Sequence, residues 1–208
     1  MWVEGDAGQR GLFGENLPVG QVEEIRAERQ GPSVIGGGLQ DRGHWCVPSA
    51  TRSRTGISNR DGFNIGSGDG FYARLDPADP QTVIVESQDG RANRVNLTTL
   101  ERQVIAPLPP DRRPKGERER WNWDTPIVMS SFDPRTLYMG SHIIFKSTDR
   151  GGSWKAISPD LTAHIDRESL QMMGARVPER ALSRHDGQTS FSTLTTIAES
   201  PIDAKLLY

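Results

Sequence analysis

The stretch Ser147-Thr148-Asp149-Arg150-Gly151-Gly152-Ser153-Trp154 fits the pattern S-x-D-x-G-x-[S/T]-W at every specified position. Runs rich in apolar residues flank it at 143–146 and 154–157, and a short polar segment with glycine between two such runs is typical of a β-hairpin. The Asp149 carboxylate can accept backbone N–H groups two residues on, and Gly151 can adopt the positive φ of a tight reversal. The alternative makes Asp149 a catalytic or metal-binding carboxylate. We expect a structural role for five residues: Ser147, Asp149, Gly151, Ser153 and Trp154.

Composition favours many short strands and turns, and so an all-β fold. The chain has 208 residues, of which 34% are hydrophobic, 22 are Gly and 14 are Pro, and its mean hydropathy is -0.59. This length allows one large or two small domains. No stretch approaches the roughly 18 apolar residues of a membrane span, so we expect no span.

Metal, cofactor and nucleic-acid chemistry find little support. Cys46 is the single cysteine, which excludes a disulfide framework and a cysteine zinc site. A net charge of -2 and a pI near 6.1 argue against nucleic acid, and the mixed-charge segment 111–120 is interpreted as a solvated loop rather than a phosphate-binding patch. The histidines have no metal-ligand spacing; they are His44, His142, His164 and His185. We expect no metal, no cofactor and no nucleic-acid partner.

A short unit, in which a turn precedes an apolar run, occurs four times. The copies are Asp79-Pro80-Gln81-Thr82-Val83-Ile84, Asp133-Pro134-Arg135-Thr136-Leu137-Tyr138, Asp203-Ala204-Lys205-Leu206-Leu207-Tyr208 and, more weakly, Gly31-Pro32-Ser33-Val34-Ile35. Their apolar pairs begin at 34, 83, 137 and 207, with separations of 49, 54 and 70, where roughly 40–50 is expected of a four-stranded propeller blade. The last interval predicts an insertion.

The clearest unit runs from Phe71 to Ile105. We expect strands at 71–75, 82–87, 93–97 and 102–105, with turns at 88–90 and 98–99. The next unit should follow the same plan across 126–157, with the 147–154 octapeptide in the position that 88–90 occupies before it. Between 158 and 190 the pattern lapses, and we expect a loop with a helical turn or two at 167–173.

The octapeptide resembles the Asp-box of sialidase-like and sortilin-like β-propellers, which closes the hairpin between the outer two strands of a blade. Asp6-Ala7-Gly8 resembles a reduced copy of it. Other segments are similar to the bacterial sortilin-like, Asp-box (BNR) repeat proteins that are often labelled glycosyl hydrolases: LPVGQ (17–21), GGLQD (37–41), GDGFY (68–72), WNWDTP (121–126), SPDLT (158–162) and IAESP (197–201). This resemblance implies an all-β partial β-propeller of about three to four four-stranded antiparallel blades.

The resemblance also implies a division of residues 1–208. We expect the end of a blade at 1–16, blades at 17–66, 67–110 and 121–158, an inter-blade insertion at 159–189 and the start of a blade at 190–208. Because blade edges must be covered, we expect a fragment whose partners include the remaining blades of a parent propeller. The family resemblance implies export to the periplasm or the extracellular space.

The ligand face of a propeller is made by loops on one rim, and we expect the site there. Asp41 and Asp69 are the candidate catalytic residues, because a glycoside hydrolase needs two carboxyl groups about 5–5.5 Å or 6.5–9.5 Å apart. The candidate binding residues are Gln40, Trp45, Trp121, Trp123 and Asp124. The alternative is that both Asp residues cap turns, and that Trp121 and Trp123 pack between blades.

Two functions remain open. The favoured one is a non-catalytic propeller that binds a protein, peptide or carbohydrate ligand through its rim or channel, as the resemblance to sortilin-like propellers implies. The alternative is a glycoside hydrolase, similar to the xyloglucan-cleaving or sialidase-like propellers, that uses a pair of rim carboxylates. Fold alone does not decide between them, because propellers carry unrelated functions.

Overall fold

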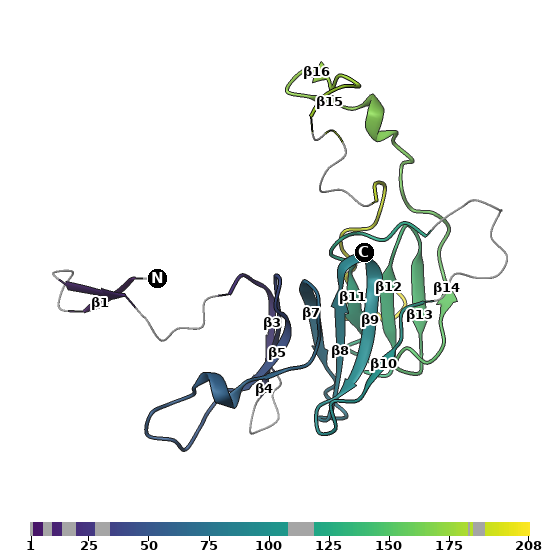
Figure 1. Ribbon diagram of the computed structural model, residues 1–208. Helices are drawn as coiled ribbons and strands as arrows, with labels where there is room; N and C mark the ends of the chain where they lie inside the picture. The colour runs from purple at the N-terminus through teal and green to yellow at the C-terminus, as the bar shows by residue number, and fades with distance from the viewer. Residues whose placement is uncertain are drawn as a thin grey trace.

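The computed structural model describes residues 2–5, 10–13, 20–27, 34–107, 119–182, 184 and 190–208, with the backbone alone for the first two ranges. Within these ranges the protein is all-β. Three four-stranded antiparallel sheets follow one another along the chain, accompanied by two two-stranded hairpins (Figure 1). The all-β prediction of successive four-stranded antiparallel blades is confirmed.

Each sheet is a meander in which consecutive strands pair, as in the blades of a β-propeller. Sheet 1 contains β3 (Val22–Ala27), β4 (Val34–Leu39), β5 (Gly43–Pro48) and β6 (Phe63–Asn64). Sheet 2 contains β7 (Gly70–Leu75), β8 (Thr82–Ser87), β9 (Arg91–Asn96) and β10 (Arg102–Val104). Sheet 3 contains β11 (Ile127–Met129), β12 (Leu137–Gly140), β13 (Ile144–Ser147) and β14 (Lys155–Ala156). The sheets form part of a propeller, and the strands of sheet 2 lie within two residues of those expected.

Two hydrophobic clusters hold the sheets together. The first lies between sheets 1 and 2 and consists of Cys46, Ile65, Ala73, Val83, Val85 and Val95. The second lies between sheets 2 and 3 and consists of Ile84, Ala92, Ile105, Ile127, Leu137 and Met139. Strand β8 supplies both clusters because its successive side chains point to opposite faces. All six of its residues are buried, so sheet 2 is the covered middle layer.

The recurring Asp turns share one hydrogen-bond geometry. The Asp79 carboxylate accepts the Gln81 N–H at 3.2 Å, and the Asp133 carboxylate accepts the Arg135 N–H at 3.1 Å. Asp203 accepts the N–H of Lys205 in the same way, at 2.9 Å. An Asp side chain that accepts a backbone N–H two residues on mimics a backbone turn and so helps the chain to reverse. In sheets 2 and 3 this turn joins the first two strands.

The 147–154 octapeptide joins β13 to β14, the third and fourth strands of sheet 3. Its expected position, equivalent to 88–90, was wrong, because 88–90 joins the second and third strands of sheet 2. The equivalent connection in sheet 3 is the short turn 141–143. Both connections are polar segments between apolar runs, so spacing alone did not tell them apart.

Residues 158–208 follow sheet 3 in two parts. The first contains a 3-10 turn, η3 (Arg167–Ser169), and a hairpin of β15 (Gln171–Met172) with β16 (Ala175–Arg176) that lies away from the three sheets (Figure 1). The hairpin was not expected at 171–176. The second part packs on sheet 3, where the Leu194 N–H donates to the Ser141 carbonyl at 2.6 Å and a Cβ on Gly140 would lie 2.8 Å from Ile197.

The N-terminal hairpin pairs β1 (Trp2–Gly5) with β2 (Arg10–Phe13). The segment Asp6-Ala7-Gly8, expected to mark a further blade edge, lies outside the described residues, as does most of the charged segment 111–120.

Candidate functional site

Most of the predicted site residues lie at one end of the sheets. Turns alternate between the two ends of an antiparallel meander, so the turns 40–42, 88–90 and 141–143 share one end with the inter-sheet connections 65–69 and 119–126. This end, which we call the upper rim, is uppermost in Figure 1. The 147–154 turn lies at the opposite end, the lower rim.

An open depression of about 500 Å³, which we call the rim depression, lies at the upper rim between sheets 1 and 2. Small-molecule sites in proteins usually measure about 300–1,000 Å³. Its lining consists of Asp41, Arg42, Gly43, Asn64, Gly66, Ser67, Gly68, Asp69 and Gln88. Because this lining is polar side chains and glycine backbone, the depression suits a polar ligand.

The structure brings Asp41 and Asp69 together in the rim depression. The Asp69 side chain is buried, and its Oδ1 accepts the backbone N–H of Asp41 at 2.7 Å. Its Oδ2 accepts the Gln88 Nε2 at 2.9 Å. Asp41 itself has a left-handed φ of 60°, a conformation that Asp tolerates better than most residues. Asp69 therefore braces the β4–β5 turn against sheet 2, as the turn-capping interpretation expects. Sequence reasoning missed Gln88, which was included only as a turn residue.

Arg42 and Asn64 form the side of the depression on sheet 1. The Arg42 carbonyl accepts the indole N–H of Trp45 at 2.9 Å and the Asn64 Nδ2 at 3.2 Å. Trp45 lies in β5 opposite Asn64, and 37% of its surface is exposed. Gln40 is exposed at the start of the turn and donates its backbone N–H to the Gln21 carbonyl at 3.0 Å.

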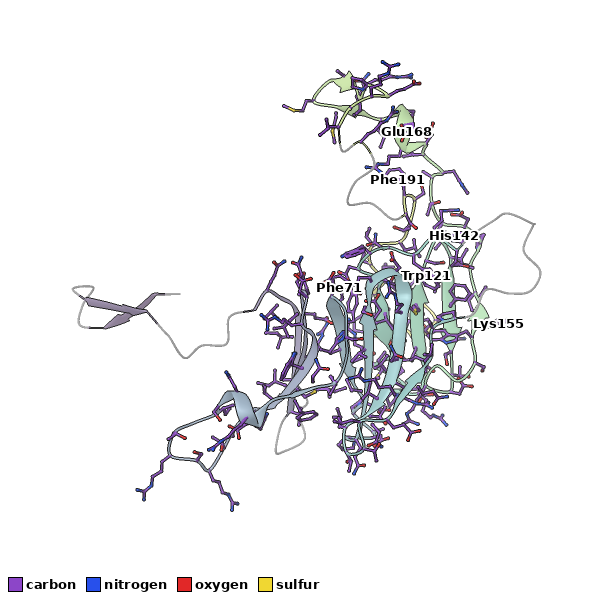
Figure 2. The ribbon with its side chains drawn as sticks, in the orientation of Figure 1. Phe71, Trp121, His142, Lys155, Glu168 and Phe191 are labelled. Carbon is purple, nitrogen blue, oxygen red and sulfur yellow. The ribbon has the colours of Figure 1, made fainter. Side chains whose placement is uncertain are left out.

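Trp121 and Trp123 occupy different environments. Trp121 stacks on Phe145 with ring centroids 5.8 Å apart, and it covers Gly90, where an added Cβ would lie 2.6 Å from the indole. It lies at the upper rim over sheets 2 and 3 (Figure 2). Trp123 is 46% exposed, and its carbonyl accepts the Asp89 N–H at 3.2 Å. Trp121 therefore contributes to packing, while Trp123 presents an open ring.

Asp124 lies beside a charged cluster that sequence reasoning missed. Arg74 of β7 donates to Glu24 of β3 at 2.6 Å and to the Ile127 carbonyl of β11 at 3.0 Å, so one guanidinium joins the first strands of all three sheets. Partial burial raises the pKa of Asp124, and the negative charges of Glu24 and Glu23 raise it further. These contacts join residues 50 and 53 positions apart in sequence, so no local sequence pattern predicts them.

Burial also raises the pKa of two groups near Asp124, which are Tyr72 and Glu86. It raises the pKa of Tyr72 to about 12, with the charge of Asp124 adding to the effect. Glu86 is completely buried, and burial raises the pKa of its carboxyl group well above the usual value, again with help from Asp124. A charged residue inside the apolar run of β8 was the available sequence signal, since Glu is almost never fully buried without a partner.

The described ranges contain no group of three or more His, Cys, Asp or Glu side chains placed to hold a metal ion. They also contain no helix long and apolar enough to cross a membrane. The chain matches no protein-family model and no curated protein.

Proposed function

We propose that this chain is a non-catalytic scaffold that binds a protein, peptide or glycan ligand at its upper rim, in and around the rim depression. In this proposal the chain is part of a sortilin-like Asp-box repeat propeller, and the 147–154 turn is its Asp-box, a structural fastener on the lower rim. Further blades of a parent propeller would be its structural partners.

The engagement of both Asp69 carboxylate oxygens carries the proposal. One oxygen accepts a backbone N–H at 2.7 Å and the other accepts an amide N–H at 2.9 Å. Both bonds tie Asp69 to neighbouring loops of the protein, which favours a loop-holding role over that of a general acid or nucleophile, which must be directed at the substrate. The rim depression around Asp69 is open and polar, which suits reversible binding rather than water-excluding chemistry.

A binding test follows from the side chains that line the depression. The wild-type chain is screened against arrays of oligosaccharides and of peptides, and hits are titrated by calorimetry. We expect Arg42→Ala to weaken binding of a hit by about tenfold or more, because a charge-assisted hydrogen bond is worth roughly 1.5–3 kcal/mol. The matched control is Arg52→Ala, an exposed arginine in the loop 49–62. Equal binding by wild type and Arg42→Ala would contradict the proposal.

A glycoside hydrolase is the second candidate, because Asp41 and Asp69 do line one depression. Retaining and inverting enzymes both need two carboxyl groups that flank the scissile bond. The discriminating test incubates the chain with β-glucans and measures reducing sugar. Release that is lost in Asp41→Asn and in Asp69→Asn, with folding intact by circular dichroism, would replace the binding proposal with the hydrolase.

A further inference from the structure

Glu86 is a buried acid below the upper rim, between sheets 2 and 3. It lies in β8 two residues after Ile84, so its side chain points to the same face, toward the cluster that contains Ile127 and Leu137. Its exposed fraction is 0%. The segment 121–125, which carries Trp123 and Asp124, lies against it, because the Thr125 N–H donates to its Oε1.

The hydrogen bonding of Glu86 is incomplete. Oε1 accepts the Thr125 N–H at a long 3.3 Å, while Oε2 is buried and has no hydrogen-bond partner among the described residues. An ionised carboxylate presents about four lone-pair sites and needs several donors when it is removed from water. This environment therefore holds a neutral carboxylic acid far better than a carboxylate.

The acidic groups that face Glu86 disfavour a negative charge on its carboxyl group. Asp124 approaches from the 121–125 segment and Asp89 from the η2 turn (Gln88–Gly90). Tyr72 of β7 is also close enough that a negative charge on Glu86 would raise the pKa of its hydroxyl group. His44 of β5 meets Glu86 at its backbone carbonyl, at 2.7 Å, and burial lowers the pKa of His44 to about 4, so its ring is neutral above that pH. The backbone N–H groups of Thr125 and Gly90 lower the pKa of Glu86, but burial and the charge of Asp124 outweigh them.

We propose that Glu86 is a positioning residue that couples the order of the 121–125 segment to pH. In its neutral form Glu86 stays buried and holds the segment through Thr125. In its ionised form it draws water into the interface, and the segment separates from sheet 2. Trp123 and Asp124 then lose their fixed place at the upper rim, so ligand binding there is stronger in acid. That last consequence alone rests on the proposed function.

The direction of the pH effect follows from linkage. The folded-state pKa of Glu86 lies above its ordinary value of 4.5, so the closed state binds its proton more tightly than the open state does. The stabilisation is complete below pH 4.5 and is lost as the pH rises through the folded-state pKa.

Hydrogen exchange of the segment amides tests the proposal without a ligand, so its failure is separate from failure of the binding function. Protection factors for 122–125 are measured from about pH 5 to about pH 8, each corrected for the intrinsic rate. We expect wild-type protection to fall by up to about tenfold per pH unit until the folded-state pKa is reached. Glu86→Gln, which stays neutral, should keep its protection constant across this range.

The matched control is Glu101→Gln, an exposed glutamate in the turn before β10, which should follow the wild type. If Glu86→Gln shows the wild-type loss of protection, or if wild-type protection does not change with pH, the proposal is overturned. If Glu86→Gln does not fold, the wild-type profile still decides, because protection of 122–125 that stays flat through pH 8 would overturn the coupling.

Discussion

Asp149 shows how much of a turn one carboxylate can organise. It accepts the Ser147 hydroxyl at 2.7 Å, the Ser153 N–H at 2.8 Å and the Ser153 hydroxyl at 2.7 Å. The bonds from Ser153 and Ser147 lower its pKa to about 2. Two specified residues of the octapeptide, Ser147 and Ser153, are thus its hydrogen-bond partners, which accounts for their place in the pattern by a structural role.

Replacement of Asp149 by Asn should remove an acid-sensitive part of the stability. The folded-state pKa is depressed from 3.8 to about 2, so the ionised form contributes stability above pH 3.8 that is lost as the pH falls through about 2. We expect Asp149→Asn to unfold at lower urea than the wild type at pH 7, and the two midpoints to converge in acid. The control is Glu179→Gln, which alters an exposed glutamate outside the octapeptide. A gap that stays constant down to pH 2 would contradict this prediction.

The hairpin that contains Asp149 also fastens sheet 3 to sheet 2. Trp154 donates its indole N–H to the Ile105 carbonyl at 2.5 Å, and Arg150 pairs with the fully buried Asp76 at 2.6 Å. Gly151 lies so close to sheet 2 that a Cβ would come within 2.7 Å of Ile105. The turn is therefore a contact between neighbouring sheets as well as a reversal of the chain.

A comparison of Gly151 with Gly174 distinguishes the cost of backbone strain from the cost of crowding at this contact. Gly151 and Gly174 both have φ of 84°, but an added Cβ meets Ile105 at Gly151 and nothing within 4 Å at Gly174. Gly174→Ala should cost only the left-handed conformation, about 1–2 kcal/mol. Gly151→Ala should cost about 1–3 kcal/mol more because of overpacking. Equal losses of unfolding free energy in denaturant titrations would show that the close approach to Ile105 is not maintained.

The Arg74 cluster provides a second link between sheets. Arg74→Met should lower the unfolding free energy by about 2–4 kcal/mol, because it leaves the Glu24 carboxylate largely buried without its main partner. Arg26→Met is the matched control: Arg26 contacts the same Glu24 oxygen at 3.2 Å, but 58% of its side chain is exposed. Such an exposed pair contributes about 0–1 kcal/mol. Similar effects of the two substitutions would mean that Arg74 does not join the sheets.

The sequence could predict the features of this molecule that are local. Alternating runs located the strands of sheet 2, and repeated Asp turns indicated that units of one kind follow one another. The links between units were not predictable, because Glu24 with Arg74, Asp69 with Gln88 and Glu86 with Thr125 are 50, 19 and 39 positions apart. A single polar residue in a strand looks the same whether it faces water or a neighbouring sheet. The hairpin at 171–176 was missed because its two-residue strands carry no readable alternation.

The three sheets present two unlike ends, a lower rim of structural turns and an upper rim with a polar depression and an exposed Trp123. The central claim is that the upper rim binds ligand without transforming it. The most direct test is chemical-shift mapping: the isotope-labelled chain is titrated with a hit from the arrays, and the ligand is recovered afterwards. We predict shifts at 40–42, 64–69, 88 and 121–125, with the ligand intact. Shifts centred on 147–154, or recovery of a cleaved ligand, would contradict the account.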